Sequence, residues 1–167
     1  NLVEASVSGD FNIITLNQGR QADGTSAGAD TGGHYINAQV NGTNNQLNIS
    51  QVGNGHYAEA MVSGSSNTAA IVQTGTRNQT FAAITGNSNT MSVNQAGPSN
   101  YADVTLNGPS NVVSLTQNGT GGNKSTISLT NAGGPANVNV TQGGQGVFSI
   151  NQTCVTAGGC AATTIRQ

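Results

Sequence analysis

The sequence predicts an all-β fold, a two-sheet, cross-β-like β-solenoid without helices, built from β-arch repeats of 22 residues. Three observations support this prediction. Asparagine recurs every 22 residues, and each one is followed by a glutamine six residues later and a glycine two residues after that. A second series halfway between these divides the period into two half-repeats of 11 residues. Inside each half-repeat apolar and polar residues alternate, which is typical of strands bounded by turns.

The two series place the same residue type at the same offset in successive repeats. The first series consists of Asn45, Asn67, Asn89 and Asn111, then Gln51, Gln73, Gln95 and Gln117, then Gly53, Gly75, Gly97 and Gly119. The second consists of His34, His56, Asn78 and Asn100, closed by Gly42, Gly64, Gly86 and Gly108. Glycines at strand corners are expected where the turn needs a positive φ.

The template extends to both ends of the chain and predicts about seven rungs of two strands in one domain, residues 1–167. Residues 1–7 form the first strand, and residues 12–18 form its partner. After Gln117 the grid shifts through small glycine-containing insertions, which turns tolerate. The last rung contains Phe148 and Ile150 in one strand and Ile165 in the other.

Composition excludes several classes of protein. Only 6% of the residues are charged, the formal net charge is -2, and Arg20, Arg77, Lys124 and Arg166 are the only basic side chains apart from histidine. This leaves no basic patch for nucleic acid. No apolar run approaches the roughly 20 residues of a transmembrane segment, and no charged-then-apolar leader opens the sequence, so a mature, soluble-phase chain is expected.

Buried amides lower stability unless they are bonded, so their regular inward placement needs a partner. If rungs stack at roughly 4.8 Å, each inward amide lies over its equivalent and pairs with it. The sequence therefore predicts amide ladders. Their expected members are Asn12, Gln18, Asn45, Gln51, Asn67, Gln73, Asn78, Asn89, Gln95, Asn100, Asn111, Gln117, Asn123, Gln142, Gln152 and Gln167.

Two segments interrupt the repeat. Residues 19–33 form an inserted surface loop, in which Asp23 and Asp30 lack the closely spaced acidic ladder of calcium loops, so neither a metal nor another cofactor is predicted. Residues 153–161 form a loop in the last rung that contains the only two cysteines, Cys154 and Cys160. A disulfide between them is predicted, with a reduced pair or an intermolecular bond as the alternatives.

No set of residues predicts an enzyme. His34 and His56 lie one rung apart where other rungs carry asparagine, so we interpret them as part of the polar ladder. Glu4, Glu59 and Asp103 share one outward position with an aromatic residue, so they form no acid pair. Three tyrosines that recur beside strand starts, Tyr35, Tyr57 and Tyr101, either fill surface corners or form a stripe on which a sugar or dye stacks.

Both ends of the predicted solenoid follow the repeat and carry no visible cap. Open sheet edges recruit further strands, and the low charge does little to oppose stacking. We therefore expect subunits to add end to end into a fibre.

The unit Q-x-G-x-x-N-x-A resembles the repeats of the curlin family. It is present as Gln95, Gly97, Asn100 and Ala102, and with histidine as Gln51, Gly53, His56 and Ala58. The resemblance implies a β-solenoid subunit of curli, the functional amyloid of bacteria. Such a subunit is secreted through an outer-membrane export pore and assembles outside the cell, often on a nucleator subunit. Its cell-surface fibres support biofilm matrix, adhesion and aggregation.

The chain departs from the curlin pattern in two respects. The second glutamine of the pattern is replaced by aliphatic residues in most repeats and kept only as Gln152; the replacements are Val62, Ile84, Leu106 and Leu129. The cysteine pair is an addition to that pattern. An alternative function is therefore a monomeric secreted β-solenoid that acts as an adhesin or binds ice or another ligand. Its outward residues are irregular for ice, and its turns lack the aspartates of calcium-dependent rolls.

Overall fold

A computed structural model describes residues 1–19, 32–132, 134–156 and 158–167, which form fourteen strands and no helix. The odd-numbered strands are β1 (Leu2–Ser8), β3 (Tyr35–Thr43), β5 (Tyr57–Ser65), β7 (Gln79–Thr85), β9 (Tyr101–Asn107), β11 (Lys124–Asn131) and β13 (Val147–Cys154). The even-numbered strands are β2 (Ile13–Gln18), β4 (Gln46–Asn54), β6 (Thr68–Thr76), β8 (Thr90–Pro98), β10 (Val112–Gln117), β12 (Asn137–Gln142) and β14 (Thr163–Arg166). None of the described segments contains a helix that could span a membrane.

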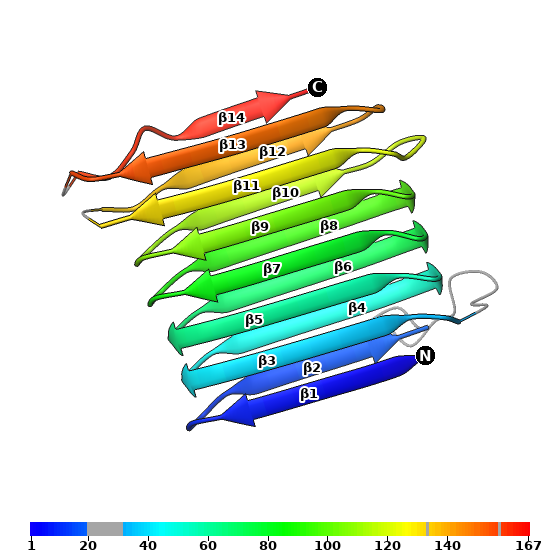
Figure 1. The fold of residues 1–167 in the computed structure, drawn as a ribbon, viewed down its shortest axis with the longest axis horizontal. Helices are drawn as coiled ribbons and strands as arrows, with labels where there is room; N and C mark the ends of the chain where they lie inside the picture. The colour runs from blue at the N-terminus through cyan, green and yellow to red at the C-terminus, as the bar shows by residue number, and fades with distance from the viewer. Residues whose placement is uncertain (20–31, 133, 157) are drawn as a thin grey trace.

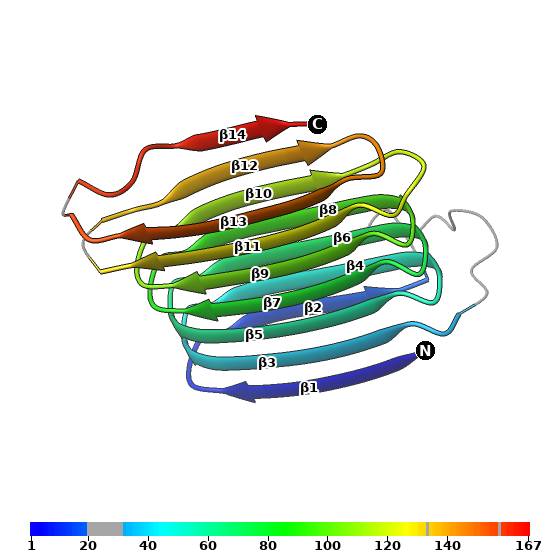
Figure 2. The same cartoon turned by 45° about the horizontal axis from the view of Figure 1, so that its top comes forward.

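The strands make two seven-stranded sheets that face each other, one from the odd strands and one from the even strands. The chain passes from one sheet to the other and back, so strands adjacent within a sheet are two apart in sequence and run parallel (Figures 1 and 2). This arrangement confirms the predicted all-β, two-sheet β-solenoid.

The register places equivalent residues of successive repeats beside one another. Gln51 pairs with Gln73, and Gln73 with Gln95, at the predicted spacing. The shift predicted after Gln117 is confirmed: Gln117 pairs with Gln142, although they are 25 residues apart. Because the extra residues lie in the connections between strands, the register of the strands themselves does not change.

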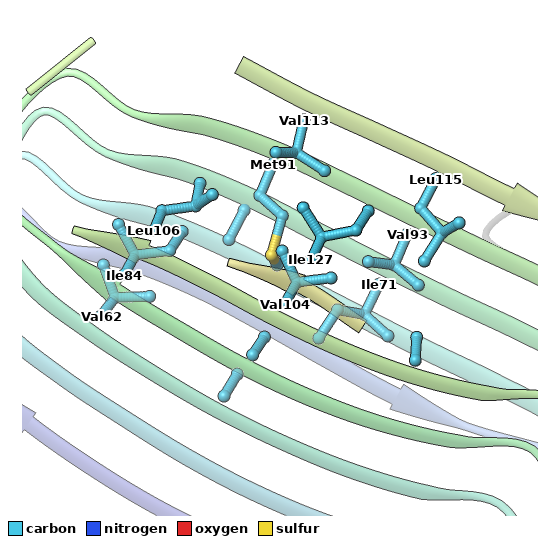
Figure 3. Packing of buried hydrophobic residues seen from close by; sticks show 14 of the residues in the cluster. Val62, Ile71, Ile84, Met91, Val93, Val104, Leu106, Val113, Leu115 and Ile127 are labelled. Carbon is cyan, nitrogen blue, oxygen red and sulfur yellow. The ribbon is translucent and has the colours of Figure 1, made fainter. Parts of the chain in front are cut away.

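The core consists of the apolar side chains that each strand directs toward the facing sheet. The middle strands alternate buried and exposed residues, as the period-two pattern predicts. Ile71, Val93 and Leu115 of the even sheet lie beside Val104 and Ile127 of the odd sheet (Figure 3). By contrast, every residue of β1 is exposed, since it has a neighbouring strand on one side only.

The two predicted loops are described to different extents by the structure. Within the inserted loop 19–33, residues 20–31 lie outside the described residues, and so do Asp23 and Asp30. In the predicted loop 153–161, β13 continues through Cys154 and the next strand begins at Thr163. The single domain over 1–167 stays a prediction.

Glycines line the corners of the solenoid for two physical reasons. Gly64 has φ 124°, a conformation that side chains rarely adopt. A Cβ atom on Gly64 would also collide with the backbone carbonyl of Gly86 in the next rung. Positive φ recurs at the other predicted turn glycines: Gly53, Gly75, Gly86, Gly97, Gly108 and Gly119. Close stacking of the rungs from Gly42 to Gly108 therefore favours a residue without a side chain at this corner.

We predict that Gly64→Ala lowers the free energy of unfolding by about 2 kcal/mol or more, from backbone strain and the collision with Gly86. Chemical denaturation of the dilute chain measures this loss. Gly144→Ala is the matched control, because a Cβ atom there meets no atom within 4 Å. Equal denaturation midpoints for the two variants would contradict the explanation.

Candidate assembly site

A continuous ladder of glutamine side chains runs the length of the even sheet. Its members are Gln18, Gln51, Gln73, Gln95, Gln117, Gln142 and Gln167. Each Nε2 donates to the Oε1 of the next member toward the C-terminus. The donor–acceptor distance is 3.1 Å for the first step, 2.9 Å for the following steps as far as Gln142, and 3.5 Å at Gln167. All the donors point the same way, so the ladder has a direction.

The glutamine ladder also joins the two sheets. The Nε2 atoms of Gln51, Gln73 and Gln95 each donate a second hydrogen bond, 3.0 Å long, to the backbone carbonyl of the first residue of a facing odd strand. These three side chains are fully buried. An unpaired buried amide would cost about 1–3 kcal/mol, so each rung depends on its neighbours for satisfied amides.

A ladder of asparagines at the start of the even strands runs in the opposite direction. Asn45 Nδ2 donates to Asn12 Oδ1 at 3.1 Å, and the step repeats through Asn67, Asn89 and Asn111 at 3.0 Å. Each Oδ1 also accepts the backbone N–H of the following asparagine. The donors point toward the N-terminus, so the two ladders have opposed polarity.

The second asparagine series is linked mainly through the backbone. Asn100 N donates to Asn78 Oδ1 at 2.9 Å, while Asn78 Nδ2 bonds the carbonyls of Thr74 and Gly97. A bond between side-chain amides joins Asn123 Nδ2 to Asn100 Oδ1 at 3.0 Å. This column therefore stacks as the sequence predicts, but uses side-chain oxygens to bond backbone amides.

Two histidines occupy the same column and replace the amide oxygen with a ring nitrogen. His56 N donates to His34 Nδ1, and Asn78 N donates to His56 Nδ1, both at 3.2 Å. The rings stack with centroids 5.0 Å apart and an interplanar angle of 6°. Their geometry is that of a polar ladder.

Sequence reasoning missed three buried polar residues that complete the ladders. Thr80 Oγ1 lies between Gln73 and Gln95 and bonds both, and Ser125 Oγ does the same for Gln117 and Gln142. The sequence did contain a signal for them. Thr80 and Ser125 are hydroxyl residues at an inward position that is alanine in two other repeats, Ala58 and Ala102, so a polar partner was to be expected there.

Asn131 was missed because it belongs to the facing sheet. The residue in line with Asn111 in the next repeat is Ala136, which has no amide. Asn131 Nδ2, at the end of β11, bonds Asn111 Oδ1 at 2.8 Å instead. The periodicity of one sheet cannot reveal a substitute supplied by the other.

Gln152 lies outside the ladders, which corrects its predicted membership. Its neighbour in the preceding rung is Leu129, the end of the aliphatic column. Since Leu129 offers no amide, Gln152 Nε2 donates to the Ala161 carbonyl at 3.3 Å. The column from Val40 to Leu129 is buried, as expected for an inner position.

Among the described residues, each sheet ends in an edge strand on either side: β1 and β13 in the odd sheet, β2 and β14 in the even sheet. At the N-terminal end the apolar side chains of Leu2, Val3, Val7, Phe11 and Ile13 are exposed. Toward the C-terminal end, three buried side-chain oxygens of the described residues have no hydrogen-bond donor: Asn123 Oδ1, Asn131 Oδ1 and Gln152 Oε1. The backbone N–H and C=O groups on the outer side of the edge strands can accept another strand.

The C-terminal rung contains the predicted disulfide, between Cys154 and Cys160, whose Cα atoms are 5.4 Å apart. Cys160 N also donates to the Pro135 carbonyl at 3.1 Å. The disulfide closes the connection between β13 and β14. The hydrogen bond to Pro135 fastens this connection to the previous rung.

The outer face of the odd sheet carries an aromatic row. Tyr35 stacks on Tyr57 with ring centroids 5.0 Å apart, and Phe81 continues the row to Tyr101. Tyr57 donates to Glu59 Oε2 at 2.9 Å, and this bond, aided by desolvation, raises the pKa of Tyr57 to about 12. The rings cover one another's faces, which leaves little ring face for a sugar or dye to stack on. The row therefore favours the first of the two predicted roles, in which the aromatic rings fill the surface.

Two acidic residues of this face lie two rungs apart in one column. No group of three or more metal-ligating side chains occurs within the described ranges. Glu59 and Asp103 stand in one column with Phe81 between them. The geometry offers ladders and sheet edges for assembly.

We predict that Gln95→Leu lowers the free energy of unfolding by about 3 kcal/mol or more. The change removes the acceptor of Gln73 and Thr80 and the donor to Gln117, and leaves several buried polar groups unpaired. Denaturation of the dilute chain is the measurement. Gln39→Leu, the same change at an exposed outer position, is the control. A similar loss in both variants would show that the ladder is not the cause.

Comparison with known families agrees with the geometry. The model of the curlin-associated repeat matches residues 42–75 and 64–97, two spans that begin one period apart. They include Gln51, Gln73 and Gln95 of the glutamine ladder. No significant match to a curated protein or to a solved structure is found. Over residues 42–97, the chain is therefore similar to the repeats of the curlin family.

Proposed function

We propose that this chain is the structural, non-enzymatic subunit of an extracellular curli-like amyloid fibre and that it polymerises end to end. The observation that carries the proposal is that the outermost strands of both sheets, β1, β2, β13 and β14, each pair with one neighbouring strand among the described residues. The repeat assignment supports it independently.

The register defines the joint between two copies. If the columns continue across the joint, β13 of one copy pairs with β1 of the next, and β14 with β2. Val147 then lies beside Leu2, and Ile165 beside Leu16. Val147 and Leu2 are exposed in the single subunit, at 77% and 51%, so joining two copies buries apolar surface.

The direction of the glutamine ladder supports a head-to-tail joint. Gln142 donates to Gln167 at the C-terminal end, and Gln18 begins the ladder at the N-terminal end. Gln167 Nε2 of one copy can therefore donate to Gln18 Oε1 of the next. A head-to-head joint would instead place like groups of the ladder opposite each other, so the proposed fibre is polar.

Similarity to the curlin-associated repeat over residues 42–97 supports the cellular part of the proposal. The chain would be secreted by a bacterium through an outer-membrane export pore and would polymerise on the cell surface, where a nucleator subunit can start the fibre. The fibres would support biofilm matrix, adhesion and aggregation. The disulfide fits an oxidising, extracellular site.

We predict that the purified, oxidised chain forms fibres with an axial repeat of roughly 4.8 Å, the spacing between strands. Sedimentation and cryo-electron microscopy across a range of concentrations provide the measurement. A persistent monomer at high concentration would contradict the proposal and favour a monomeric secreted solenoid, either an adhesin or an ice- or ligand-binding protein.

A proline at the free edge tests whether β1 is the joint. Leu2 N donates to the carbonyl of His34, the residue before β3, so alternate residues of β1, including Ala5, direct their N–H groups to the outer side of the sheet. We predict that Ala5→Pro folds but does not polymerise alone, and that small amounts stop elongation of the unsubstituted chain. Ala5→Ser keeps the N–H group and is the control. Normal growth of the proline variant would exclude the β1 edge.

A further inference from the structure

Phe11 is the one bulky residue in its column of corner residues, which it shares with Asn44, Ser66, Ser88 and Ser110. It has φ 56° and is 81% exposed, at the corner between β1 and β2. The four residues at the same corner of later rungs share this left-handed backbone but are small and polar. Asparagine tolerates this conformation well, whereas a bulky side chain is disfavoured there.

Nothing in the single subunit explains a phenylalanine at this corner. Its ring is exposed to solvent, and its backbone has a conformation that asparagine or serine fits better. Both disadvantages would be offset if the ring were buried in an assembly.

The loop closed by the disulfide lies on the same side of the solenoid as Phe11, but in the last rung, whereas Phe11 is in the first. The β1–β2 connection and the β13–β14 connection are on one side in both views (Figures 1 and 2). Cys154 ends the column of corner residues that begins at Gly9 and passes through Gly108 and Asn131. Val155 follows Cys154 and is 76% exposed.

We propose that Phe11 of one copy docks on Val155 and the disulfide-closed loop of the preceding copy. This inference rests on the proposed end-to-end fibre and names a contact within its joint. When the columns continue across the joint, Gly9 follows Cys154 and Asp10 follows Val155. Phe11, the next residue, then lies over the start of the loop.

The disulfide prepares this surface before assembly. The disulfide joins two cysteines that are six residues apart in the sequence. The hydrogen bond from Cys160 N to the Pro135 carbonyl fixes the loop against the previous rung. Less conformational entropy is therefore lost when a second copy binds Val155. The partner that fits is a second copy of this chain, since the register that aligns the two strands also brings these apolar groups together.

The test compares Phe11→Asn, Val155→Ser and the double variant of the oxidised full chain. Critical concentration for assembly is one readout, and the denaturation midpoint of the dilute monomer is the other. We expect Phe11→Asn to raise the critical concentration about tenfold, as loss of a buried aromatic contact predicts. Its monomer midpoint should stay the same or rise, because asparagine suits the left-handed corner.

The double variant tests whether the two residues touch. If they do, it assembles only slightly worse than Phe11→Asn alone, because the contact is already lost. Val72→Ser, a similar change on the outer face of β6, is the control and should leave the critical concentration unchanged. Reduction of the disulfide should weaken assembly of the unsubstituted chain more than that of Phe11→Asn.

Three results would overturn the inference. They are normal assembly of Phe11→Asn, independent effects of the two substitutions, or a lower monomer midpoint for Phe11→Asn, which would assign the ring to the subunit's own fold. If the unsubstituted chain itself stays monomeric, the proposed function fails and this contact fails with it. If the unsubstituted chain assembles but the variants do not behave as expected, only the Phe11 contact fails and the proposed fibre stands.

Discussion

Parallel, in-register stacking is the constraint on which the rest of this structure depends. It places each side chain beside its equivalents one rung away, so every inward column must suit a neighbour of its own kind. Aliphatic side chains meet this condition by packing, as Ile71 and Val93 do. Amides meet it by donating to one neighbour and accepting from the other, as Gln73 does. Stability is consequently a property of adjacent rungs.

The opposed directions of the two ladders make the ends of the subunit chemically different. Glutamine donors point toward the C-terminus, and asparagine donors point toward the N-terminus. The asparagine ladder stops at Asn131, before the last rung, whereas the glutamine ladder reaches both ends, with the Oε1 acceptor of Gln18 at one and the Nε2 donor of Gln167 at the other. The complementary surface is therefore the opposite end of the same molecule, and this geometry favours polar stacking over any joint between like ends.

Much of this fold is predictable from the sequence because the repeat is exact where neighbours constrain both sides. The spacing of Asn67, Gln73 and Gly75 is sufficient to predict strands, corners and register. What the period cannot reveal is a contact between the two sheets. Asn131 replaces a missing amide from the facing sheet, and Gln152 leaves its ladder because its neighbour is a leucine. These outcomes depend on which side chains meet across the core, which no single-strand pattern encodes.

Several departures from the repeat lie where the constraint is weakest. A residue in a middle rung must suit two neighbours, whereas a residue in an end rung has one neighbour in the subunit and is free to vary on the other side. Phe11, Gln152 and the disulfide between Cys154 and Cys160 all lie in the first or last rung. Middle rungs built on a shared ladder would stack on almost any similar solenoid. The terminal rungs are therefore the part of the chain that can distinguish its own copies from other solenoids with the same repeat.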